Sequence, residues 1–101
     1  MTNKQTKKGN KMNVSNIVNN NGNKVPNQFQ ILNNCEQYFQ SYSSIIVKID
    51  RDTKVFLDSK FWNYSNTTSK YRNIFLGETT KETQKKINSG EYLLTNLNGS
   101  N

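Results

Sequence analysis

The aromatic residues are confined to one part of the chain, and this confinement limits where a hydrophobic core can form. All 11 of them fall between Phe29 and Tyr92, whereas the first 24 residues contain five lysines, eight asparagines and no acid. Such a segment buries too little apolar area to offset the conformational entropy that ordering would cost. The sequence therefore predicts a disordered Lys- and Asn-rich tail over residues 1–25, a small domain over 26–98 and a disordered end at 99–101.

Apolar residues that follow Pro26 recur at intervals of three and four, as they do along one side of a helix. The residues with this spacing are Phe29, Ile31, Leu32, Cys35, Tyr38, Phe39 and Tyr42. The pattern predicts a helix over residues 27–40, with Asn27 as its N-cap and Cys35 buried as a core thiol.

The next segment alternates between apolar and polar residues, which is typical of strands. In SSIIVKID, the residues Ile45, Val47 and Ile49 share one face. A polar turn at residues 51–53 follows, and KVFLD then returns with its own alternation. The two segments predict a β-hairpin.

Two short helices and a last strand are predicted in the second half of the chain. Residues 65–67 (Ser-Asn-Thr) offer N-caps for a helix over 67–76, and Thr79 and Glu82 have capping-box spacing for a helix over 80–89. A glycine directly follows each helix, as is common at helix C-termini. The segment EYLLTNL then reads as a strand. The predicted fold class is α+β, in the order α-β-β-α-α-β behind the disordered tail.

The residues that most enzymes use for proton transfer or metal binding are scarce. The chain has no His, its single Cys lies on the predicted apolar stripe, and Asp50 and Asp52 flank the predicted hairpin turn, where carboxylates are common. It has neither a glycine-rich phosphate loop nor a nucleophile elbow. The sequence therefore predicts a protein that is not an enzyme and that uses no metal or cofactor.

Targeting signals are also missing from the sequence. The N-terminal lysines are not followed by the apolar stretch of a secretory signal, and no run approaches the roughly 18 apolar residues of a membrane span. These features predict a cytoplasmic protein that does not contact the membrane. The sequence leaves its oligomeric state open.

The two predicted helices offer one candidate binding site, for nucleic acid. Two short helices joined by a turn that contains glycine resemble a DNA-reading helix-turn-helix. The residues suited to contact phosphates or base edges are Lys70, Arg72, Lys81, Thr83, Gln84, Lys85 and Lys86. The lysines of the predicted tail would add contacts that do not depend on base sequence. The alternative is a plain helical hairpin with a solvated lysine face, and the sequence does not separate the two.

The aromatic segment over residues 61–72 offers a second candidate site, for a protein partner. Its large side chains have two interpretations, either as part of the core or as a binding surface. On the second interpretation, Tyr64, Asn66 and Thr68 would contact a host or virion protein. The low number of arginines, two in 101 residues, favours a protein partner over base readout, whereas the distribution of positive charge favours nucleic acid. The sequence therefore predicts weak binding of DNA or RNA through the helix over 80–89 and the basic tail, with a protein-binding module as the alternative.

Two segments, SYSSII and FWNYSNTTSKYRNIFLGETTKETQKKINSGEYLLTNLN, resemble a family of small proteins of unknown function. Members of this family are encoded by phages and other mobile elements of low-GC Gram-positive bacteria. The resemblance covers residues 39–98. It implies a phage or mobile-element origin and a place in the cytoplasm of the host cell, and it implies no activity and no site residues.

Overall fold

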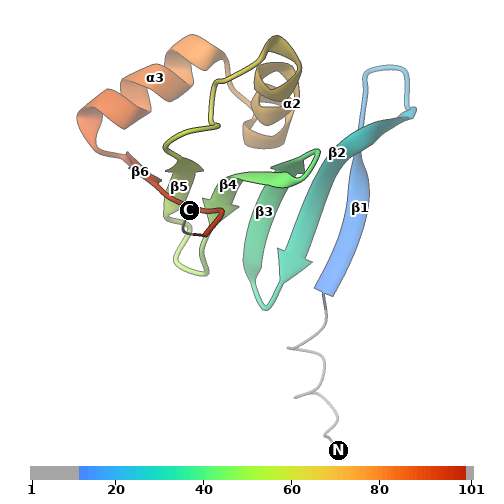
Figure 1. Ribbon diagram of the computed structural model, residues 1–101, viewed down its shortest axis with the longest axis horizontal. Helices are drawn as coiled ribbons and strands as arrows, with labels where there is room; N and C mark the ends of the chain where they lie inside the picture. The colour runs from blue at the N-terminus through green and yellow to red at the C-terminus, as the bar shows by residue number, and fades with distance from the viewer. Residues whose placement is uncertain (1–11, 100–101) are drawn as a thin grey trace, which may run out of the picture.

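A computed structural model describes residues 12–99 and shows a six-stranded sheet with two helices (Figure 1). The strands are β1 (Met12–Val18), β2 (Lys24–Asn33), β3 (Glu36–Ser41), β4 (Ser44–Ile49), β5 (Val55–Asp58) and β6 (Tyr92–Thr95). The helices are α2 (Asn66–Leu76) and α3 (Thr80–Ser89). The order of the strands in the sheet follows the chain. Neighbours from β1 to β5 are antiparallel, and β6 is parallel to β5, so the two helices form the crossover between them.

The predicted order α-β-β-α-α-β is wrong, because residues 27–40 form strands and not a helix. β2 and β3 pair directly, with Ile31 opposite Tyr38. They are joined by a two-residue turn at Asn34 and Cys35, whose φ angles are 54° and 72°. Such left-handed angles at both central residues fit the right-handed twist of a hairpin. The apolar spacing of three and four therefore arises from two alternating strands with a turn between them.

Because residues 27–40 do not form a helix, the roles predicted for Cys35 and Asn27 are also wrong. Cys35 is exposed in the β2–β3 turn, so the prediction of a buried core thiol is wrong. Asn27 is not an N-cap but a residue of β2 with a φ of 65°, and its carbonyl accepts a hydrogen bond from the backbone N–H of Tyr42. Asparagine tolerates this left-handed conformation better than most residues do.

The predicted disordered tail is also wrong for residues 12–25. β1 pairs with β2 from Met12 opposite Asn33 to Val18 opposite Lys24. The sheet supplies backbone partners and one apolar face, so a polar segment needs few buried side chains of its own to become ordered. In β1 that side chain is Ile17, which is only 3% exposed. Residues 1–11, and residues 100–101 of the predicted disordered end, lie outside the described part of the chain.

The predictions for residues 44–95 are confirmed element by element. β4 and β5 form the expected hairpin. Ser65 caps α2 by accepting a hydrogen bond from the backbone N–H of Thr68, and Thr79 and Glu82 form both hydrogen bonds of the capping box. Each helix ends at a glycine in the left-handed conformation. Neither helix is long and apolar enough to cross a membrane.

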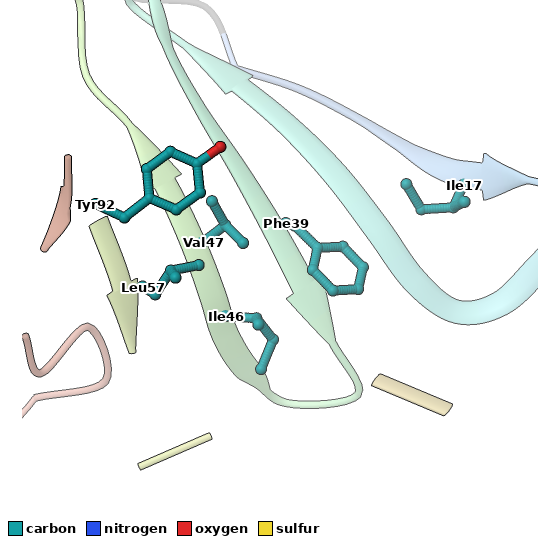
Figure 2. Close-up of a cluster of buried hydrophobic side chains, with 6 residues drawn as sticks. All are labelled: Ile17, Phe39, Ile46, Val47, Leu57 and Tyr92. Atoms are coloured by element: carbon teal, nitrogen blue, oxygen red, sulfur yellow. The ribbon is translucent and has the colours of Figure 1, made fainter. Parts of the chain in front are cut away.

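The core packs side chains of the two helices against one face of the sheet, and Figure 2 shows its six buried side chains. Its buried side chains are Ile17, Phe39, Ile46, Val47, Leu57 and Tyr92. The partly buried residues packed against them include Phe61, Trp62, Tyr71, Phe75, Leu76 and Ile87. The rings of Phe39 and Phe75 stack with centroids 5.7 Å apart. The interpretation of the aromatic segment as part of the core is therefore confirmed for Phe61, Trp62 and Tyr71, and Phe75 packs in the same core.

Gln28 is a fully buried polar residue whose amide nitrogen and oxygen have no hydrogen-bond partner in the described part of the chain. It lies opposite Ser41, whose hydroxyl bonds to that of Thr68. A buried amide without partners costs about 1–3 kcal/mol. Replacing Gln28 by Met is therefore expected to raise the melting temperature, at about 4–8 °C for each kcal/mol recovered. Thr68→Val breaks the buried hydrogen bond to Ser41 and is expected to lower the melting temperature. A melting temperature of Gln28→Met below that of the original chain would contradict the prediction.

Candidate functional site

The structure separates the residues predicted for nucleic-acid contact into two groups. Lys70 on α2 and Lys81, Gln84 and Lys85 on α3 have exposed side chains. Arg72 and Thr83 are fully buried. Lys86 is half-buried, with its Nζ 2.8 Å from Oε1 of Glu78. Only the first group is free to meet a ligand, and it presents three lysines on two helices.

Arg72 is the centre of a buried polar network between the two helices. Its Nη1 donates to the carbonyl of Trp62 at 2.5 Å and to Oδ1 of Asn63 at 3.2 Å. Its Nη2 donates to Oδ1 of Asn73 at 2.9 Å and to Oγ1 of Thr80 at 2.7 Å. The guanidinium also lies over the ring of Trp62, 5.0 Å from its centroid. Burial lowers the pKa of Arg72, which nevertheless stays protonated. These contacts identify Arg72 as a structural residue.

Glu78 forms a second network between α3 and β6. Its carboxylate accepts hydrogen bonds from Lys86, Thr83 and Tyr92, at 2.8, 2.6 and 3.0 Å. Burial opposes ionisation of Glu78, but the three hydrogen bonds outweigh it and hold its pKa below the ordinary value. The hydrogen bond to Glu78 raises the pKa of Lys86 in turn. The contact of Lys86 with Glu78 therefore joins α3 to the loop that precedes it.

The three residues predicted for protein binding in the aromatic segment are also divided. Tyr64 is half exposed and Asn66 is exposed. Thr68 is fully buried and shares a hydrogen bond of 2.9 Å with Ser41. The ring of Tyr64 packs edge-on against Phe61, with centroids 5.2 Å apart. Of the three predicted residues, only Tyr64 and Asn66 are therefore accessible to a protein partner.

A continuous surface lies instead on the side of the sheet that the helices leave uncovered, which we call the open face. Directly opposed residues share a face of a sheet, and the core residues occupy the other one. One row of opposed residues crosses the open face from edge to edge, through Val14, Ile31, Tyr38, Lys48, Phe56 and Leu93. Phe29 lies beside this row, opposite Asn16 and Gln40.

The charged groups of the open face neutralise each other. The hydroxyl of Tyr38 donates to Oε1 of Glu36 at 2.8 Å, and Nζ of Lys48 lies 3.8 Å from the other oxygen of Glu36. The ammonium group of Lys48 also lies 5.9 Å from the ring centroid of Phe56. Burial, followed by the hydrogen bond and the charge of Glu36, raises the pKa of Tyr38. The result is an aromatic and aliphatic surface with almost no net charge at its centre.

The sequence pattern contains a signal for the open face that the helix prediction obscured. From Gln28 to Leu32, apolar Phe29 and Ile31 alternate with polar residues until Leu32 breaks the pattern. Phe29 and Leu32 are three residues apart, which fits a helical spacing, and the β2–β3 turn carries no glycine that would mark a hairpin. The row becomes visible only once the register of five strand pairs is known.

A groove of about 420 Å³ opens on the opposite face, where the β1–β2 hairpin extends beyond α2. It is lined by uncharged residues, namely Asn13, Ser15, Gln30, Ile31, Leu32, Gln37 and Phe75. In residues 12–99, no three His, Cys, Asp or Glu side chains are grouped so that they could hold a metal ion. The groove offers amide and hydroxyl groups for hydrogen bonding, and it contains no group suited to acid or base catalysis.

Comparisons with known proteins extend the resemblance that the sequence suggests. A model described as a family of unknown function (DUF8033) matches residues 12–91. The matched segment begins with β1 and ends directly after α3, so it includes the whole antiparallel part of the sheet and both helices. No curated protein and no solved structure matches the chain.

Proposed function

We propose that this chain, which belongs to the family of unknown function DUF8033, is a protein-binding module that acts through the open face of its sheet. The observation that carries the proposal is the row of six opposed residues from Val14 to Leu93. Val14 is 56% exposed and Leu93 is 38% exposed, while the residues between them are half-buried. A contiguous apolar surface of this kind marks an interaction site in a folded protein.

The electrostatics of the open face favour a protein partner over nucleic acid. A nucleic acid is held mainly by cations that neutralise its phosphates. The cation at the centre of the row, Lys48, already has Glu36 as its partner. Aromatic groups with polar tips, such as Tyr38, are enriched at protein interfaces. The open face therefore matches the centre of a protein interface better than a track for a phosphate backbone.

We also propose that the protein comes from a phage or another mobile element of a low-GC Gram-positive bacterium and acts in the host cytoplasm without catalysing a reaction. The resemblance of residues 39–98 supports this origin, and so does an abundance of asparagine and lysine, with 18 and 12 residues. A host or virion protein is the kind of partner that such an origin favours.

A second candidate function is weak binding of DNA or RNA through α3 and the N-terminal lysines. The observation in its favour is that Lys70, Lys81 and Lys85 are exposed, while the first 24 residues carry five lysines and no acid. Such contacts hold phosphates without reading base sequence and weaken as salt is added. Gln84 is the exposed side chain among these residues that is best suited to a base edge.

A pull-down of the tagged full chain from expressing cells, with and without nuclease, tests the proposal. The open-face variant combines Ile31→Gln with Leu93→Glu, and the control combines Lys81→Glu with Lys85→Glu on α3. We expect the original chain and the control to capture the same protein partner whether or not nuclease is present. The open-face variant should capture at least about tenfold less of that partner. Both variants must first show the melting behaviour of the original chain.

The opposite pattern would reject protein binding through the open face. If the captured material disappears with nuclease and with the α3 variant, the second candidate function takes its place. A fluorescence-anisotropy titration with a duplex and a single strand, at low and physiological salt, would then measure the contribution of Lys81 and Lys85. Binding that is insensitive to salt would argue against contacts with phosphates.

A further inference from the structure

The β1 edge of the sheet is unprotected in the described part of the chain. β1 is the first strand of the sheet and pairs on one side only, with β2. Edge strands present unpaired N–H and C=O groups, and proteins usually shield them with charge, proline, short length or a covering element. The strand MNVSNIV has seven residues, no charge and no proline. A shift in register lies between Asn16 and Val18, so the regular part of the edge is Met12–Asn16.

The opposite edge of the same sheet shows the usual protection. β6 has only four residues and packs against α3. The chain that follows it is fixed by Asn98, whose side chain hydrogen-bonds to both backbone groups of Ile45. Figure 1 shows this contrast, with β6 beside α3 at one side of the sheet and β1 at the other side. Within residues 12–99, one edge of the sheet is therefore shielded and the longer one is open.

We propose that the β1 edge pairs with β1 of a second copy of this chain, in an antiparallel and two-fold symmetric dimer. The proposal concerns the edge of the sheet and does not depend on what binds the open face. Met12 and Val14 are 59% and 56% exposed on β1, and strand pairing would cover both while it satisfies the free backbone groups. Two-fold interfaces bring the same surface of both copies together, so the surface must be complementary to itself.

The sequence of β1 is complementary to itself when two copies pair antiparallel about Val14. In that register Val14 of one copy meets Val14 of the other, and Met12 meets Asn16. Asn13 meets Ser15 on the other face, so a polar pair forms there. The open-face rows of the two copies would join at Val14 into one longer row.

The charges that precede β1 in the sequence favour this direction of pairing. Four lysines and no acid lie in residues 1–11. In a parallel pair these segments would enter side by side, and their like charges would repel. In an antiparallel pair the two segments enter from opposite ends, and β1 itself brings no charge to the contact. A second copy paired antiparallel is therefore the occupant that this edge fits best.

Sedimentation velocity of the full chain, over roughly a hundredfold range of concentration, tests the proposal. We expect a monomer–dimer equilibrium, and we expect Val14→Lys to weaken the association constant at least about tenfold because it places two like charges opposite each other. The matched control is Leu93→Lys at the other end of the row, which should leave the dimer intact. The original chain remaining a monomer throughout, or Val14→Lys remaining a dimer, would overturn the proposal.

Hydrogen exchange of the unmodified chain gives a second test if Val14→Lys does not fold. The amides of Met12–Asn16 that point away from β2 should be protected at high concentration and lose that protection on dilution. Amides of β3, which is central in the sheet, should not change and serve as the internal control. Protection of the β1 amides that is independent of concentration would contradict pairing with a second copy.

Discussion

Replacing Arg72 by Ala is expected to remove about 3–5 kcal/mol of stability, the usual loss when a charged partner is taken out of a buried network. Four acceptors, at Trp62, Asn63, Asn73 and Thr80, each lose the hydrogen bond that Arg72 donates. The ring of Trp62 also loses the cation that covers it. Since small domains are stable by only about 5–15 kcal/mol, the variant should be largely unfolded at moderate urea concentrations.

Urea denaturation followed by Trp62 fluorescence measures this loss. Arg72→Lys is a useful companion, because one ammonium group cannot replace the planar fork of donors that reaches four acceptors, so the variant should also be destabilised. Lys81→Ala on the exposed side of α3 is the control and should change stability by less than about 0.5 kcal/mol. If Arg72→Ala kept the original midpoint and lost only binding of nucleic acid, Arg72 would be a surface residue after all.

The burial of Arg72 shows why helices were predictable from this sequence while the role of their side chains was not. The capping signals at Ser65 and Thr79 act within four residues, so the sequence alone locates both helix starts. Whether a basic residue on such a helix faces water or the interior depends on the packing of Trp62 and Thr80 around it. Helical spacing is the same in both cases, so Arg72 resembled a phosphate contact.

The sequence did not predict strands β1, β2 and β3, and the reason differs from that for Arg72. β1, β2 and β3 are rich in Asn, Gln and Ser, and their order comes from pairing with strands that are close in space. Strand propensity depends on such neighbours more than helix propensity does. The turns at Asn34–Cys35 and at Tyr42 use left-handed residues other than glycine, so the usual hairpin signal is missing. The open face and the β1 edge both depend on these three strands, so the sequence alone did not reveal them.

Replacing Asp58 by Ala is expected to cost about 3 kcal/mol or more, because four partly buried donors lose one shared carboxylate acceptor. Asp58 is 2% exposed and lies at the end of β5. One carboxylate oxygen accepts from the backbone N–H groups of Lys60 and Phe61, and the other accepts from Leu97 and from the side chain of Asn98. The same Asn98 bonds to the backbone of Ile45, so the carboxylate joins β4, β5 and the segment after β6.

Asp58 should also make the stability of the protein depend on pH in the acid range. Burial alone would raise its pKa, but the hydrogen bonds from Leu97, Phe61, Asn98 and Lys60 outweigh burial, and the pKa is lowered. The unfolded chain then binds the proton more readily than the folded one. The stabilisation is therefore complete above the ordinary pKa of 3.8, and it is lost as the pH falls through the lower pKa of the folded state.

Urea midpoints measured between about pH 2 and pH 7 test this dependence. The original chain should lose stability on acidification, and Asp58→Asn should be less stable at neutral pH and show a shallower acid dependence. Part of the dependence should remain in that variant, because the lowered pKa of Glu78 acts in the same direction. Asp52→Asn, in the exposed β4–β5 turn, is the matched control and should keep both the midpoint and the slope of the original chain. Equal acid dependence in Asp58→Asn and the original chain would show that Asp58 does not hold the C-terminal segment through its charge.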